Sequence, residues 1–124
     1  MPIGVHPWLD CRFLVEGHSQ LEPFHEHLGH VQHARVAALR GDAVRLWETR
    51  DSRVEVNRIV GSRDMVVWYS GGNTITGNEV AGGRYGTHFM YSHDNLVTGN
   101  RYVGNVVGIF AMYSRGLTLE RNLL

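Results

Sequence analysis

From about residue 41 to residue 124, short apolar segments alternate with turn residues, and the pattern repeats about every 22 residues. Each copy has three such segments, rich in Val, Ile, Thr, Tyr and Phe and separated by Gly, Asn, Ser and Asp, which is typical of strands joined by turns. One asparagine recurs in every copy, at Asn57, Asn78, Asn100 and Asn122. Three short strands per copy predict an all-β fold, a right-handed parallel β-helix of four coils over residues 41–124, its hand following the chirality of parallel crossovers.

Stacked coils place equivalent residues about 4.8 Å apart, so each column of the repeat becomes a ladder along the solenoid. We expect the asparagine column to be structural, because a buried amide at a corner can bond both backbone and the next amide. Serines and tyrosines recur at the same period. The serine hydroxyls are expected to form hydrogen bonds, and the tyrosine rings to stack, at another corner of the coil. Two apolar columns are expected to fill the interior: Leu46, Val67, Phe89 and Ala111, and Val54, Ile75, Val97 and Leu119.

Composition indicates one small domain able to bury a core, since 43% of the 124 residues are hydrophobic. A formal net charge of zero gives no basic footprint for nucleic acid. No apolar run is long enough for a membrane span, and the opening residues lack the pattern of an export signal. The single cysteine, Cys11, cannot form an internal disulfide.

Residues 1–40 do not follow the repeat and form a divergent segment that contains six of the eight histidines. The spacing of apolar residues between Leu21 and Val31 is typical of an amphipathic helix, which could cap the open end of the solenoid. His27, His30 and His33 would then recur every three residues, either as solvated side chains or as metal ligands. The segment could equally be a damaged version of preceding coils.

A further column of the repeat is a candidate binding site, because it contains two tryptophans and two methionines: Trp47, Trp68, Met90 and Met112. If this column faces outward, His88 shares its face, and imidazole and thioether are ligands that copper(I) prefers. The stripe could also be a docking face for a protein partner. If the pleat is inverted, the same residues are core, with methionine filling gaps.

The segments LRGDAVRLW, RDMVVWYS, RYGTHFMYSHDN, VTGNR and MYSRG resemble the copper-associated β-helix family called NosD, over roughly residues 39–124. The resemblance implies a periplasmic accessory protein without enzymatic turnover. It also implies work with a membrane ABC transporter in assembling the copper–sulfur centre of nitrous oxide reductase. On this interpretation Met90, Met112 and His88 are the metal ligands. The residues expected to contact the partner are Trp47, Trp68, Tyr69, Tyr91 and Tyr113.

The alternative function is a carbohydrate-binding or polysaccharide-modifying β-helix, since tyrosine ladders line sugar grooves and stacked carboxylates can act as acid and base. Asp51 and Asp94 share a column but are separated by Gly72. We place Asp42 and Asp64 on opposite faces of the pleat. Two further features are expected at the surface: an ion network of Arg63, Asp64 and Arg84 worth little energy, and a turn histidine, His93.

Overall fold

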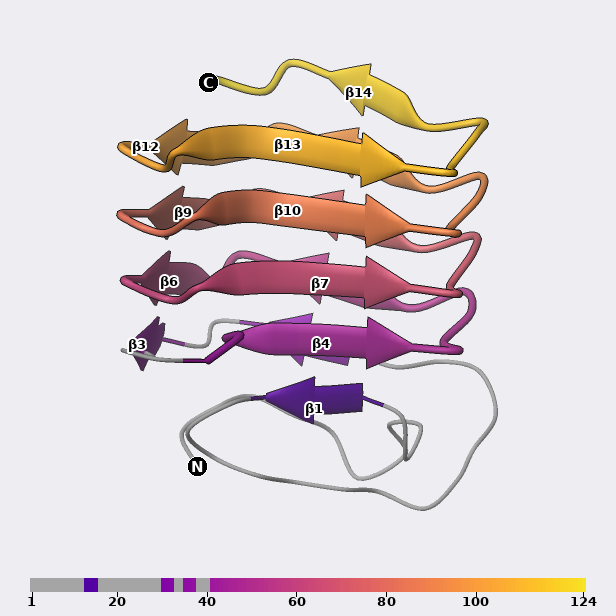
Figure 1. Cartoon of the computed structure of the whole chain (residues 1–124), viewed down its shortest axis with the longest axis horizontal. Helices are drawn as coiled ribbons and strands as arrows, with labels where there is room; N and C mark the ends of the chain where they lie inside the picture. The colour runs from indigo at the N-terminus through magenta and orange to yellow at the C-terminus, as the bar shows by residue number, and fades with distance from the viewer. Residues whose placement is uncertain (1–12, 16–29, 33–34, 38–40) are drawn as a thin grey trace.

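The computed structural model describes residues 13–15, 30–32, 35–37 and 41–124. Within these ranges the chain is all β, and its strands stack as the coils of a solenoid (Figure 1). In Figure 1, β4, β7, β10 and β13 in front run left to right, and the chain returns behind them while it rises toward the C-terminus, so the coils wind right-handed as predicted.

Three sheets form the three sides of the solenoid, each taking one strand from every coil. The first holds β1 (Phe13–Val15), β4 (Val44–Trp47), β7 (Asp64–Trp68), β10 (Tyr85–Met90) and β13 (Val107–Met112). The second holds β2 (His30–Gln32), β5 (Arg53–Glu55), β8 (Thr74–Thr76), β11 (Leu96–Thr98) and β14 (Thr118–Glu120). The third holds β3 (Arg35–Ala37), β6 (Arg58–Val60), β9 (Glu79–Ala81) and β12 (Arg101–Val103).

The start of the solenoid differs from the sequence expectation. β2 pairs in parallel with β5, and β3 with β6, so two strands of a further coil precede the boundary expected at residue 41. β1 pairs antiparallel with β4. The expected helix between Leu21 and Val31 falls mostly outside the described residues, but its last two residues, His30 and Val31, belong to β2. His27 and His33 lie outside the described residues.

The core is built by the two predicted apolar columns. Leu46, Val67 and Phe89 on the first sheet are fully buried, as are Val54, Ile75 and Val97 on the second. The prediction is wrong for the last member of each column: Ala111 is exposed, and Leu119 is 49% exposed. Both lie on the last described coil, where no described strand stacks above them.

Each complete coil turns at four corners, and each corner holds a residue with a φ between 49° and 69°. Left-handed backbone costs a residue with a side chain about 1–2 kcal/mol, which glycine avoids. At the fourth corner all three residues are accordingly glycine, namely Gly61, Gly82 and Gly104. At the first corner the residues are Glu48, Tyr69, Tyr91 and Tyr113, where the tyrosine rings stack.

Hydrogen-bonded ladders hold these corners together. Asn78 Oδ1 accepts from the backbone N–H of Asn57, while its Nδ2 donates to the carbonyl of Val54 and to Asn100 Oδ1. The expectation of a structural asparagine ladder is therefore confirmed. Serine Oγ atoms bridge coils in the same way, with Ser92 Oγ accepting from the N–H of Ser70.

A second asparagine ladder was missed in the sequence. The amide oxygen of Asn73 accepts from the N–H of Ser52, and that of Asn95 accepts from the N–H of Asn73. Only two of its members are asparagine, since Ser52 holds the position in the coil below, so the column is harder to recognise than that of Asn78.

Candidate functional site

The tryptophan–methionine column lies on the outer face of the first sheet. Parallel pairing places Trp68 beside Trp47 and Met90, and Met90 beside Met112. Their neighbours in the strands, Leu46, Val67 and Phe89, are fully buried. Trp47 is 46% exposed, and the other three are half-buried. The pleat therefore points the column outward, and the alternative core interpretation is wrong.

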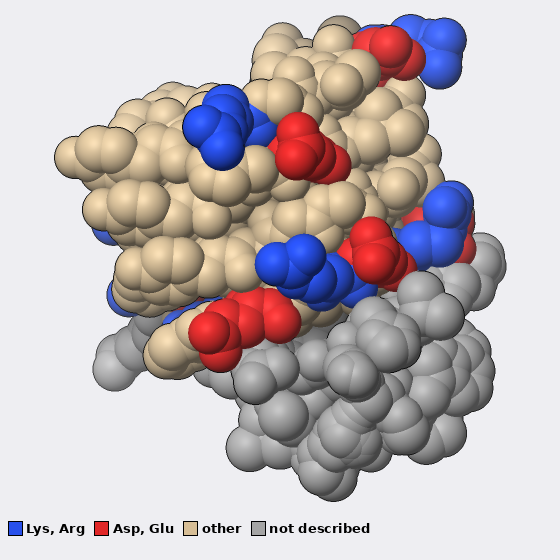
Figure 2. Space-filling model, turned by 90° about the vertical axis from the view of Figure 1, so that its right-hand side faces the viewer, with Lys and Arg blue, Asp and Glu red and all other residues tan. Residues whose placement is uncertain are grey.

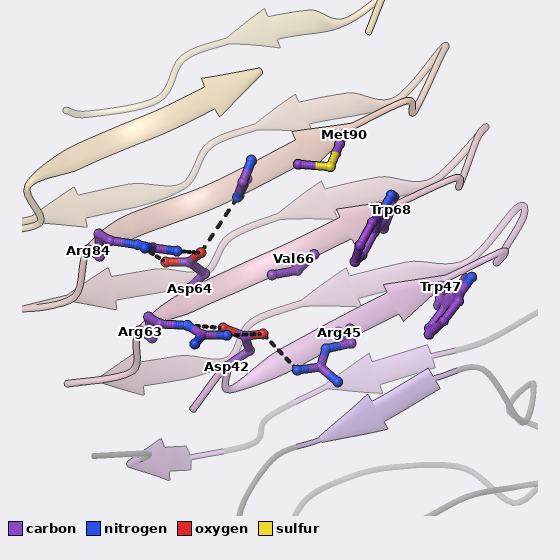
Figure 3. A pocket seen from close by; sticks show the side chains of 10 residues that line it. Asp42, Arg45, Trp47, Arg63, Asp64, Val66, Trp68, Arg84 and Met90 are labelled. Atoms are coloured by element: carbon purple, nitrogen blue, oxygen red, sulfur yellow. Dashed lines mark hydrogen bonds and ion pairs between the residues drawn. The ribbon is translucent and has the colours of Figure 1, made fainter. Parts of the chain in front are cut away.

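A groove of about 310 Å³ runs along this face across β4, β7 and β10 (Figure 3). The charged side chains Arg84, Asp64, Arg63 and Asp42 gather at one end, and Trp47, Trp68 and Met90 gather at the other. The groove is lined by Asp42, Arg45, Trp47, Arg63, Asp64, Val66, Trp68, Arg84, His88 and Met90. Met90, His88 and both tryptophans were predicted from the sequence, and the charged end was not predicted as part of a site.

The charged end consists of two carboxylates, each held by an arginine of the following coil. Asp42 accepts from Arg63 Nε at 3.1 Å and Nη2 at 3.2 Å, and also from Arg45 Nη2 at 2.9 Å. Asp64 accepts from Arg84 Nε at 3.0 Å and Nη2 at 2.6 Å. The carboxylate side chains are only 3% and 2% exposed, respectively. The expectation of a weak surface network, with Asp42 and Asp64 on opposite faces, is therefore wrong, because both acids are buried in one groove.

Asp64 is ionised in this setting. Burial by itself raises the pKa of a carboxyl group, but the hydrogen bonds and charge of Arg84, with the backbone N–H of Tyr85, outweigh burial and lower the pKa of Asp64 below its usual value. The pKa of Arg84 is raised in turn, mainly by its hydrogen bond to Asp64. A negative charge is thus fixed beside the next strand.

His88 on β10 faces that charge. Its Nδ1 lies 3.5 Å from Asp64 Oδ2. The imidazole packs edge-on against the rings of Tyr85 and Phe110, with centroids 5.0 and 5.2 Å away, which fixes its orientation. Its Nε2 is buried and has no hydrogen-bond partner among the described residues. In a neutral imidazole, donation from Nδ1 to a carboxylate leaves the lone pair of Nε2 free.

The aromatic residues form one continuous stack beside the groove. Ring centroids are 5.8 Å apart for Trp47–Trp68 and for Trp68–Tyr69, 5.2 Å for Tyr69–Tyr91 and 4.9 Å for Tyr91–Tyr113, with interplanar angles of 20° or less. Each tyrosine remains at least 41% exposed at its edge. Neighbouring rings cover each other's faces, whereas sugars stack on open faces, so this geometry does not favour the carbohydrate interpretation.

Comparison with known families identifies the chain. A family model described as periplasmic copper-binding protein (NosD) matches residues 26–124. The chain belongs to the NosD family. Neither the comparison with curated proteins nor that with solved structures gave a match.

Membership of the NosD family makes this β-helix a periplasmic copper-binding accessory protein, in agreement with the resemblance seen in the sequence. The matched region begins before β2, which agrees with the coil strands found ahead of residue 41. Among the described residues, no helix is long and apolar enough to cross a membrane.

The chemistry of several side chains on this face suits copper(I). His88 Nε2 is a buried nitrogen without a hydrogen-bond partner among the described residues, and Met90 lies in the groove with Met112 one rung beyond it on the same face. Soft thioether and imidazole ligands suit copper(I) and do not require cysteine. Within the described part of this NosD chain, no three side chains of His, Cys, Asp or Glu gather as a metal site.

A second hollow of about 430 Å³ lies at the corner beyond β7 and β10, between the tyrosine stack and the Asp51 column. Asp51 and Asp94 both line it, separated by Gly72 as the sequence indicated. His93 Nδ1 accepts from the backbone N–H of Arg115 at 3.2 Å, which confirms the expectation of a hydrogen-bonded turn histidine.

Two features of the NosD groove were not predicted from the sequence as parts of a site: the Asp42 and Asp64 carboxylates, and the arginines that hold them. A signal was present, because an arginine follows each of these acids by about one coil length, Arg63 after Asp42 and Arg84 after Asp64. Opposite charges one coil apart on a solenoid are neighbours in space.

Proposed function

We propose that the outer face of the first sheet binds copper(I) through His88 Nε2 and Met90, which line the groove, and through Met112, one rung beyond them. The observation that carries this proposal is the buried Nε2 without a partner, in a ring whose other nitrogen faces an ionised carboxylate. This carboxylate–histidine arrangement is the usual second shell of a metal-bound imidazole, fixing its tautomer and raising its basicity. Trp68 lies one rung below Met90 and would shield the metal from water.

The role of the bound copper is inferred from the family and from the aromatic surface beside the groove. We propose that the copper is cargo, transferred without chemical change to nitrous oxide reductase during assembly of its copper centre, together with a membrane ABC transporter. The stack of Trp47, Trp68, Tyr69, Tyr91 and Tyr113 is the proposed contact surface for the partner, because aromatic side chains are enriched in protein interfaces.

The charge distribution supports such a surface. Figure 2 shows the side of the solenoid at the ends of the first-sheet strands, where neighbouring acidic and basic side chains are set in a larger uncharged area. A face of mixed sign suits docking by shape and apolar contact better than steering by a single-sign field.

Anaerobic copper(I) titration against a competing chelator tests the thioether ligands. The double variant Met90→Leu/Met112→Leu keeps volume and apolarity, and we expect roughly 10- to 100-fold weaker binding than in the wild type. The variant Met65→Leu is the control, because Met65 is fully buried on β7 and should leave copper affinity unchanged. Equal affinity in the double variant and the wild type would remove the thioethers from the site.

A further inference from the structure

The groove contains oxygen ligands that the proposed copper site does not use. Asp42 and Asp64 line the same groove as His88 Nε2, and their side chains are almost fully buried. Asp64 Oδ2 lies 3.5 Å from His88 Nδ1. A carboxylate beside an imidazole nitrogen is a ligand set for borderline divalent ions such as zinc and cobalt. Such ions would compete with copper(I) for His88.

Both carboxylates are occupied by guanidinium groups. Arg63 uses Nε and Nη2 against both oxygens of Asp42, and Arg84 uses the same two atoms against both oxygens of Asp64. This fork arrangement takes up the lone pairs that a metal would need. Arg63 and Arg84 are half exposed and lie at the charged end of the groove.

The net charge of the groove also disfavours the binding of divalent cations. Arg45, Arg63 and Arg84 face Asp42 and Asp64, which leaves one net positive charge among these five residues. A positive site repels a divalent ion about twice as strongly as a monovalent one. The ligands left uncharged and accessible are the imidazole and the thioethers.

We propose that Arg63 and Arg84 determine the metal selectivity of the groove, by withholding its two carboxylates from divalent cations and leaving the soft ligands for a monovalent one. The inference rests on the proposed function of this groove. It assigns the two arginines a role that copper binding alone does not require.

The test is titration of cobalt(II), followed by its visible absorption, and of zinc(II) by calorimetry. We expect the variant Arg63→Gln/Arg84→Gln to bind both ions roughly tenfold or more tightly than the wild type, because Asp64, freed from Arg84, joins His88 as a ligand. Adding Asp64→Asn to this variant should abolish the gain. The single variant Arg84→Lys keeps the charge but not the fork, and should give an intermediate gain if the double variant does not fold, as judged by circular dichroism.

The matched control is Arg58→Gln/Arg101→Gln, since these two arginines both pair with Glu79 on the third sheet. That change frees a carboxylate of the same chain outside the groove. No gain in cobalt affinity on loss of Arg63 and Arg84, or an equal gain in the control, would overturn the inference. These titrations contain no copper, so failure of the wild type to bind copper(I) would reject the proposed function alone.

Discussion

Replacing Asn78 with alanine should lower the free energy of unfolding by about 3 kcal/mol, because its amide joins three coils. Its Oδ1 accepts from the backbone N–H and the side-chain amide of Asn57, and its Nδ2 donates to the carbonyl of Val54 and to Asn100. Asn78 is 1% exposed, so water cannot replace these bonds. Denaturant unfolding followed by circular dichroism measures the loss.

Asn105→Ala is the matched comparison for this prediction. The Asn105 amide makes two bonds, accepting from the N–H of Gly83 and donating to the carbonyl of Val80, and it is only partly buried. Its loss should therefore cost about half as much or less. Equal losses for the two variants would contradict the view that the buried ladder of Asn78 holds the coils in register.

Replacing His88 with alanine should weaken copper(I) binding by roughly 100-fold or more, because even loss of an outer-shell partner typically costs 10- to 100-fold. His88 is the histidine whose Nε2 is buried in the groove, and its removal leaves only thioethers as ligands. Competition with a copper(I) chelator under anaerobic conditions measures the change.

The variant His93→Ala is the control, because it removes an imidazole that lies outside the groove. His93 lies at the corner, where its Nδ1 accepts from the backbone N–H of Arg115. We expect its replacement to leave copper affinity unchanged while destabilising the corner slightly. If both histidine variants bind copper as the wild type does, the metal is not held in this groove.

The sequence predicted the solenoid because its columns are regular. Four asparagines keep one period, and the apolar columns of Leu46 and Val54 repeat with it, so pairing register followed directly from alignment. The outward column of Trp68 and Met90 could be identified but not oriented, since tryptophan and methionine suit either side of a strand. Burial of Val67 and Phe89 in the structure resolved that ambiguity.

Other features could not be predicted, because they depend on contacts between residues in different columns of the repeat. Asp42 and Asp64 differ by one position in the repeat, so alignment gave no reason to place both in one groove. The free nitrogen of His88 depends on a carboxylate from the neighbouring strand and on the rings of Tyr85 and Phe110. The strands β2 and β3 were missed because their segments lack the asparagine and the corner residues that mark the later coils.

X-ray absorption at the copper edge of the chain loaded with one equivalent of copper(I) tests the central claim most directly. Ligation by His88, Met90 and Met112 predicts sulfur scatterers together with one imidazole, and predicts loss of the sulfur signal in the Met90→Leu/Met112→Leu variant. A spectrum with nitrogen and oxygen neighbours alone in the wild type would contradict the account, because it would exclude both thioethers as ligands.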